Sequence, residues 1–332
     1  MAATIKDIAQ KAGVSNAMVS RALSGRGPVA PAKKERILRI AREMGYVPPR
    51  MAIAVSPSGI RTIGLCVSSI SRSSSPYVLH QILVGVYDVL PPCCRLLIQN
   101  LDRLKPEAVC SSPCDGYLIL SQQERDLDFF QLAIKKRIPM VAISHRLPLD
   151  VPCVTTDEAG GIAKAMELLL DYGHRRIGII EGPQGEETTL IRHAGWWTAA
   201  KTRGLSPRQL PVESGNYRYR SGKSAALRLL QKHRELTALL CFNDEMALGA
   251  LDAARELGLA VPDQLSLTGY DNWDFAGHSD AYLTTVERNT VQLGAEGTHL
   301  LMEYMETGIR PRDLCLENRL VVRRSAGPVR RS

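Results

Sequence analysis

The stretch TIKDIAQKAGVSNAMVSRALSG, residues 4–25, predicts two short helices joined by a tight turn. Apolar side chains from Ile5 to Ala12 recur at helical spacing. Gly13 suits the left-handed conformation that ends a helix, and Ser15 is a suitable cap for the next helix. This second helix keeps small or directional side chains on its free side, where a structural helix would normally carry Lys and Glu.

A third helix is expected to complete the segment. It begins near Pro31, buries Ile37 and Ile40, and ends at Gly45. Two short helices separated by a glycine turn and closed by a third form a helix-turn-helix. The first 47 residues are therefore expected to fold as one small unit.

Positive charge is concentrated in the same segment. Residues 1–50 contain ten Lys or Arg and three Asp or Glu, a net charge of +7, while the whole 332-residue chain has +8. A basic segment on a near-neutral body is typical of a nucleic-acid-binding module. We therefore predict that residues 1–47 form a DNA-binding headpiece.

The rest of the chain is expected to be a linker followed by an α/β body. Residues 48–60 hold a short apolar stretch between prolines, too short for a stable isolated helix. Beyond it, apolar strands alternate with helices, which predicts parallel sheets covered on both faces. The expected strands are 61–69, 94–99, 115–120, 139–144, 175–182, 238–243 and 265–271. The expected helices include 77–90, 124–136, 158–172, 189–203, 219–232 and 244–257.

Composition and motifs exclude several classes of protein. No apolar run approaches the ~20 residues that span a bilayer, and no export signal is present, so a cytoplasmic location is expected. Nucleophile-elbow, phosphate-loop and zinc-protease motifs are lacking, so no enzymatic activity is expected. Four of the eight cysteines, Cys93, Cys94, Cys110 and Cys114, lie within 22 residues. They lack zinc-ligand spacing, so free thiols are favoured, with a redox or metal role as the alternative. No cofactor is expected.

Several motifs resemble the lactose/galactose-repressor family of bacterial transcription regulators. They are residues 4–25, LLDYGHRRIGIIEGP, CFNDEMALGAL and VPDQLSLTGYDN, in the family's order. The resemblance implies a headpiece over 1–47, a hinge helix over 48–60, and a periplasmic-binding-protein-like body over 61–332 for effector binding and dimerisation. Its amino lobe would comprise about 61–157 and 287–318. Its carboxyl lobe would comprise about 158–286 and 319–332.

The resemblance also implies which residues contact DNA. Asn16 and Ala17 match the family's two specificity positions, and Arg21 matches a base-contacting arginine. Asn can pair with adenine, Ala can touch a thymine methyl, and Arg can fork onto guanine. Val55 replaces the leucine that the family inserts into the minor groove, and it is a shorter wedge. The full expected set is Thr4, Ser15, Asn16, Ala17, Ser20, Arg21 and Val55.

A small effector, most often a sugar or nucleobase in this family, is expected between the lobes. Carboxylate and amide groups can bond sugar hydroxyls, arginine can fork onto a polar group, and tyrosine can stack on a ring. Arg192, Arg288, His145 and Arg146 could make the site cationic, which favours a carboxylated or phosphorylated sugar. The expected effector-binding residues are Ser144, His145, Arg192, Tyr217, Asn243, Asp271 and Arg288.

The predicted function is repression of an operon for carbohydrate uptake or breakdown. A homodimer would bind pseudo-palindromic operator DNA, and the effector would change its DNA affinity. The carboxyl end has no leucine heptads, so a coiled-coil tetramer is not expected. An alternative is an effector-independent regulator whose body only dimerises. The segment between Gln99 and Gly116, shorter than the family usually has and poor in helical pattern, favours that alternative.

Overall fold

The computed structural model describes eight ranges of the chain. They are residues 5–16, 18–19, 22, 30–43, 60–68, 76–121, 123–273 and 283–329. Five of the expected DNA contacts, Thr4, Ala17, Ser20, Arg21 and Val55, lie outside the described residues.

The amino-terminal segment has the expected helical core. Helices α1 (Ile5–Ala12) and α3 (Pro31–Glu43) pack together. The core also contains Val19 and Ala22. Gly13 adopts a φ of +65°, and the Ser15 hydroxyl accepts a hydrogen bond from the Met18 amide at 3.3 Å. The predicted turn and helix cap are therefore confirmed.

The chain divides into two compact units. Unit 1 comprises Met1–Ser74, Ile82–Thr155 and Val291–Leu314, and unit 2 comprises Ser75–Gln81, Thr156–Thr290 and Cys315–Ser332. Residues 75–81, expected from the sequence in the amino lobe, group with unit 2. One reason is that the Tyr77 ring packs on Trp273, with centroids 4.7 Å apart.

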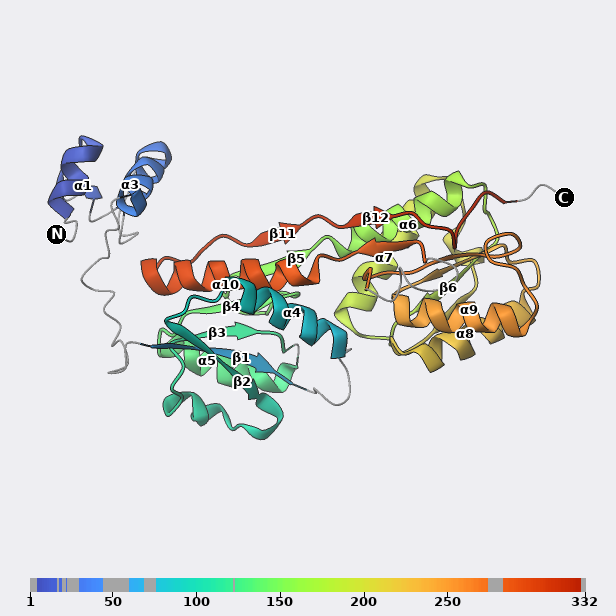
Figure 1. Cartoon of the computed structure of the whole chain (residues 1–332), viewed down its shortest axis with the longest axis horizontal. Helices are drawn as coiled ribbons and strands as arrows, with labels where there is room; N and C mark the ends of the chain where they lie inside the picture. Colours follow the sequence, from blue (N-terminus) through green and yellow to red (C-terminus); the bar gives the residue numbers. More distant parts are fainter. Residues whose placement is uncertain are drawn as a thin grey trace. The chain divides into compact units, whose positions relative to one another are not determined.

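Unit 1 is built on a sheet with the strand order β11-β5-β4-β3-β1-β2. The pairings along β2-β1-β3-β4-β5 are parallel, as predicted. Helices α4 and α10 lie on one face and α5 on the other (Figure 1). A Cβ at Gly85 would lie 1.8 Å from the Val291 carbonyl oxygen, so α4 and α10 touch through their backbones. The elements are β1 (Arg61–Val67), α4 (Pro76–Val89), β2 (Cys94–Asn100), β3 (Gly116–Ile119), α5 (Leu127–Lys135), β4 (Met140–Ile143), β5 (Cys153–Thr156), α10 (Thr290–Thr307) and β11 (Leu314–Leu316).

The short segment after β2 contains only 3-10 turns, Leu101–Arg103 and Pro106–Cys110. Pro106 and the small residues that follow it offer little to continue a regular helix. The segment between β2 and β3, which lies wholly within the described residues, therefore has no α-helix, in agreement with its poor helical pattern.

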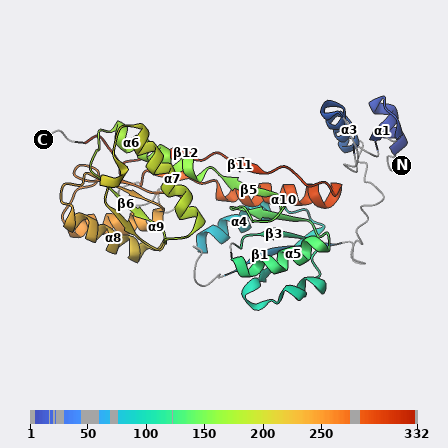
Figure 2. The same cartoon turned by 180° about the vertical axis from the view of Figure 1, so that it is seen from behind.

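Unit 2 is built on a parallel sheet with the order β7-β6-β8-β9. The helices α6 and α7 pack together, as do α8 and α9, and the two pairs cover the sheet from opposite faces (Figures 1 and 2). Strands β10 and β12 form a separate antiparallel pair. The elements are α6 (Glu158–Asp171), β6 (Ile177–Glu181), α7 (Glu187–Thr202), β7 (Val212–Ser214), α8 (Tyr219–Lys232), β8 (Ala238–Cys241), α9 (Asp244–Glu256), β9 (Ser266–Thr268), β10 (Thr285–Glu287) and β12 (Arg319–Val321).

Each unit has its own apolar core. In unit 2, the core runs from Ile162 on α6 through Trp196 on α7 to Leu240 on β8. In unit 1, one face of the sheet packs Tyr117 and Ile119 against the aromatic residues of α5. Among the helices of the described ranges, none is long and apolar enough to cross a membrane.

Candidate functional site

A buried cluster of charged side chains lies in unit 2, with Glu158 at its centre. Arg192 Nε donates a hydrogen bond to Glu158 Oε2 at 2.8 Å, and Arg288 Nε donates to Glu158 Oε1 at 2.6 Å. The Thr156 hydroxyl also donates to Oε1, at 3.0 Å. All four residues are buried. One carboxylate therefore pairs with both of these arginines.

The guanidinium of Arg192 is held on several sides. Its NH1 donates to the Phe242 carbonyl, and its NH2 lies 3.7 Å from Asp271 Oδ1. Its central carbon lies 3.6 Å from the centroid of the Tyr270 ring, a cation–π geometry. Phe242 and the residues Tyr270 and Asp271 follow strands β8 and β9. The cluster thus forms where loops leave the carboxyl ends of parallel strands, the usual place for a ligand in such sheets.

Burial and neighbouring charges shift the pKa values of Glu158 and Asp271 in opposite directions. Burial alone would raise the pKa of Glu158, but Arg192 and Arg288 outweigh it and lower this pKa to about 2. Burial raises the pKa of Asp271 to about 6, against the opposing effect of Arg192. At neutral pH both carboxylates are ionised, so the two arginines and two carboxylates carry no net charge.

A third carboxyl group, that of Asp244, lies near the cluster at the start of α9. It accepts hydrogen bonds from the Trp273 amide, at 3.1 Å, and from the Thr285 hydroxyl. Burial, and then the neighbouring Asp271, raise the pKa of Asp244 well above its usual value. Its hydrogen bonds tie the loop after β9 to α9 and β10, so it supports the backbone on which Asp271 is carried.

Tyr217 and Asn243 are brought together by a shared network. Asn243 Nδ2 donates to the Tyr217 carbonyl at 3.0 Å, and Asn243 Oδ1 accepts from the Met246 amide at 2.9 Å. The Tyr217 hydroxyl lies 2.8 Å from the Thr189 hydroxyl, and the Tyr217 backbone has a positive φ of 60°. Asn243 thus caps α9 and fixes the turn that carries the Tyr217 ring.

Ser144 and His145, which follow β4, belong to unit 1. Ser144 has a φ of 76°, and its amide donates to the Val154 carbonyl at 2.7 Å. His145 is buried, with Nδ1 2.9 Å from the Ile143 carbonyl oxygen. The two residues are therefore placed at the carboxyl end of a strand, as expected, but in a different unit from the charged cluster.

Unit 1 has its own polar network at the carboxyl ends of its strands. Ser121, after β3, donates a hydrogen bond to Asp126, and its hydroxyl also contacts that of Ser68, after β1. Ser121 and Asp126 are buried. This network was not predicted from the sequence, although Ser121 follows one expected strand and Ser68 lies near the end of another.

The structure corrects the argument for a cationic site. Arg192 and Arg288 share Glu158 as a partner, and Arg146 pairs with Asp313. These three cations are compensated by carboxylates, so the preference for an anionic sugar loses the charge argument on which it was based.

Glu158 and Tyr270 were not predicted from the sequence. Glu158 follows strand β5, whose short sequence CVTT was not recognised as a strand. Had it been, the rule that directed attention to polar residues after strands would have included Glu158. Tyr270 directly precedes the predicted Asp271, and only its ring contact with Arg192 shows its role.

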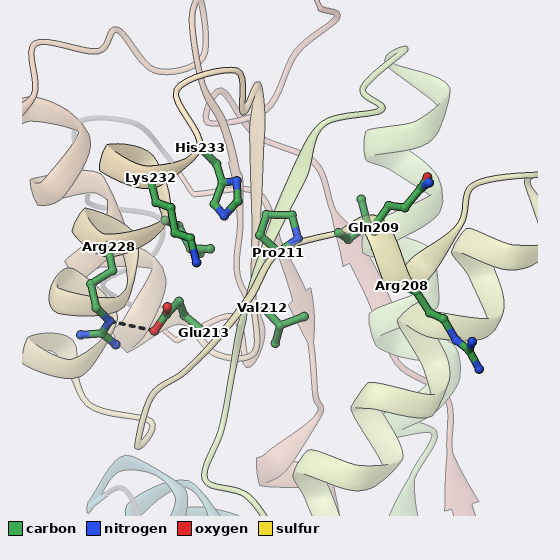
Figure 3. Close-up of a pocket in the computed structure, with 10 residues that line it drawn as sticks. Arg208, Gln209, Pro211, Val212, Glu213, Arg228, Lys232 and His233 are labelled. Carbon is green, nitrogen blue, oxygen red and sulfur yellow. Dashed lines mark hydrogen bonds and ion pairs between the residues drawn. The ribbon is translucent and has the colours of Figure 1, made fainter.

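A groove in unit 2 lies at the other end of the strands (Figure 3). Strand β7 begins there at Val212 and helix α8 ends there at Lys232. Arg228 Nε bonds Glu213 Oε2 at 2.7 Å on one side of it. The lining residues are Arg208, Gln209, Leu210, Pro211, Val212, Glu213, Arg228, Leu229, Lys232 and His233. These lining residues include none of the seven expected effector contacts.

The described part of the chain offers no evident metal centre. In the described ranges, no group of three or more His, Cys, Asp or Glu side chains is placed to hold a metal ion. All eight cysteines are free, with Cys93 and Cys110 exposed and Cys94 and Cys114 buried.

In the headpiece, two of the expected DNA contacts are described. Ser15 and Asn16 are exposed at the start of the second helix. The Ser15 hydroxyl caps that helix, so the orientation of the Ser15 side chain is set by its bond to the Met18 amide. The side-chain amide of Asn16 is exposed to solvent.

Comparisons with known proteins agree with this architecture. A model of bacterial regulatory proteins of the lacI family matches residues 4–49, and a model of the periplasmic binding protein-like domain matches residues 166–326. The probable HTH-type transcriptional repressor ExuR of Bacillus subtilis is 30% identical over 322 residues, 95% of each chain. The HTH-type transcriptional repressor CytR of Escherichia coli K12 is 33% identical over 312 residues, 92% of this chain and 90% of that protein.

Solved structures give the same result. The structure of a transcriptional regulator CelR–cellobiose complex superposes with a TM-score of 0.71 at 29% identity, covering 97% of this chain and 99% of that one. The headpiece and the parallel-sheet body, together with similarity over the whole length, identify the class of protein. It is a transcriptional regulator with a helix-turn-helix and a periplasmic-binding-protein-like body. The chain belongs to the lacI family of bacterial regulatory proteins.

Proposed function

We propose that this chain represses genes for the uptake or breakdown of a carbohydrate, and that a small sugar-type molecule controls its DNA affinity. The ion cluster around Glu158, at the carboxyl ends of the unit 2 strands, is the observation that carries the effector part of the proposal. Two relatives, ExuR and CytR, are named as transcriptional repressors, and the CelR structure contains cellobiose. These names support the proposal for this chain by similarity.

On DNA, a homodimer would bind two half-sites of a pseudo-palindromic operator, because the symmetry of the dimer is mirrored in its site. Asn16, Ala17 and Arg21 would read base edges in the major groove. Thr4, Ser15 and Ser20 would position the helix on the phosphate backbone. Val55, in the hinge over 48–60, would enter the minor groove as a short wedge.

In the body, Asp271 and Arg192 would bind the effector directly. Asp271 can accept hydrogen bonds from hydroxyl groups, and the Tyr217 ring offers a face for a sugar ring. Asn243 shapes that face through its bond to the Tyr217 carbonyl. Arg288 would act beside Arg192, and Ser144 and His145 are further predicted effector contacts.

Control would operate through the hinge segments. These segments order on DNA only when the bodies hold them at a suitable separation, so an effector that favours another arrangement of the body shifts the balance between bound and released states. A coupling of about 1–3 kcal/mol changes DNA affinity by roughly 5- to 150-fold.

Gel-shift titration of the full chain on its own upstream DNA tests the DNA part of the proposal. Arg21→Ala should lose affinity for operator more than for random DNA, because it removes one base contact per half-site, about 1–3 kcal/mol. Lys6→Ala is the matched control, and it should weaken both DNAs alike and reduce the salt dependence. Equal losses on both DNAs for Arg21→Ala would contradict the assigned role of Arg21.

A further inference from the structure

The charged cluster of unit 2 is internally complete. Glu158 accepts a hydrogen bond from Arg192 on one carboxylate oxygen and from Arg288 on the other, and Asp271 Oδ1 lies 3.7 Å from Arg192 NH2. Two positive and two negative groups therefore occupy one buried region. An incoming ligand meets arginines whose charge is already compensated.

Each nitrogen of the Arg192 guanidinium also has a protein partner. Its Nε and NH2 point at Glu158, and its NH1 donates to the Phe242 carbonyl. Glu158 is held in turn by the Thr156 hydroxyl and by its place as the first residue of α6. An anionic ligand that approached these guanidinium groups would meet Glu158, the buried carboxylate already bonded to both arginines.

We infer that Glu158 is a specificity-determining residue that makes this site select an uncharged ligand over a carboxylate or phosphate. The inference rests on the proposed function, because it assumes that the effector binds beside Arg192. A negative group placed there would face two carboxylates, and like charges brought together across an interface strongly oppose binding. Hydroxyl groups of a neutral ligand bring no such repulsion, and they can donate to Asp271.

The charge of Glu158 can be removed without changing its size. Glu158→Gln leaves two arginines against one carboxylate, so the cluster gains a net positive charge and becomes an anion site. Glu167→Gln is the matched control, because Glu167 lies exposed on the same helix and the substitution changes the total charge equally.

The test is the dissociation constant of inorganic phosphate, measured by isothermal titration calorimetry on the full chain at pH 7.5 and constant ionic strength. We expect E158Q to bind phosphate about tenfold or more tightly than wild type, a change of ~1.4 kcal/mol, while E167Q behaves as wild type. An E158Q protein that gains no affinity, or a wild type that binds phosphate equally well, overturns the inference.

Two further variants keep the test decisive. E158Q/R288Q restores the charge balance and should lose the gain; if the gain persists, its cause is not charge and the inference fails. Asp271→Asn removes the other negative charge without breaking the Glu158 pairs, so it should also gain phosphate affinity if E158Q does not fold. A folded D271N without that gain contradicts the inference.

Galactose and galacturonate provide a matched pair of ligands for the wild type. Tighter binding of galacturonate than of galactose would overturn the inference. Failure of the proposed function would instead show as absence of operator binding in the gel shift, a result that leaves the phosphate measurement unaffected.

Discussion

The two units contain similar parallel sheets, but the polar side chains at the carboxyl ends of their strands differ. In unit 1, the groups after β1 and β3 are small hydroxyls and one carboxylate, Ser68, Ser121 and Asp126, joined by hydrogen bonds. In unit 2, the corresponding region is a buried network of ions centred on Glu158. The same architecture therefore supports two kinds of polar site, and only that of unit 2 depends on a balance of charge.

Removing one arginine from the unit 2 network should have the largest effect on stability. Arg192→Met leaves Glu158 with a single arginine partner, Arg288, and breaking a buried ion pair in this way costs about 3–5 kcal/mol in the free energy of unfolding. Urea unfolding followed by tryptophan fluorescence is a direct measurement, because all three tryptophans of the chain, Trp196, Trp197 and Trp273, belong to unit 2.

The matched control is Arg203→Met, at the end of the same helix. Arg203 pairs with Asp171 at an exposed position, and such pairs contribute about 0–1 kcal/mol. A loss below about 1 kcal/mol for Arg192→Met would show that the buried network does not stabilise unit 2 more than a surface pair does.

The unit 1 network should be less sensitive. Ser121→Ala removes the hydroxyl that donates to Asp126, and a buried group left with one hydrogen bond fewer costs about 1–3 kcal/mol. Urea unfolding followed by far-ultraviolet circular dichroism measures the change. Ser111→Ala, whose exposed hydroxyl donates to the Ala108 carbonyl, is the control and should change stability by about 0.5 kcal/mol or less. A loss for Ser121→Ala as large as that for Arg192→Met would remove the distinction between the units.

The smallest expected effect is on the pH dependence of the free energy of unfolding. Asp271 and Glu158 should contribute to it with opposite signs. The pKa of Asp271 is raised from 3.8 to about 6, so the folded state binds this proton more readily than the unfolded state. Stability from this group therefore increases as the pH falls from about 6 to about 4. Each proton contributes at most about 1.4 kcal/mol per pH unit.

Glu158 should have the opposite behaviour. Its pKa is lowered from 4.5 to about 2, so its contribution is fully present above pH 4.5 and is lost as the pH falls from there towards 2. Comparing the unfolding free energies of wild type and D271N between pH 7 and 5 isolates Asp271. A difference that does not change with pH over this range would contradict the assignment.

Much of the fold was predictable from local patterns. The capped helix after Gly13 follows from residue types that have one favoured position. The strand at 177–181 was predicted from a continuous apolar run. Strand β5 escaped prediction because two of its four residues are threonines and its apolar run is short, and β7 because its three residues are partly exposed and form no apolar run.

Individual residues of the site could be predicted from the sequence, but the contacts between them could not. Arg192, Asp271 and Arg288 were each expected, but the carboxylate that the two arginines share was not. Glu158 is 34 residues from Arg192 and 130 from Arg288 along the chain. No local pattern indicates that a carboxylate so distant neutralises both arginines, and this pairing reverses the charge argument that was made from the sequence.

Operator affinity measured in the presence of matched ligands tests the account most directly. The full chain, bound to its own upstream DNA in a gel shift, would be titrated with neutral sugars, the corresponding sugar acids and the sugar phosphates. The account predicts that a neutral sugar changes the operator dissociation constant by roughly 5- to 150-fold and that its acid and phosphate do not. A change produced by an acid or phosphate, with no effect of the neutral sugar, would contradict it.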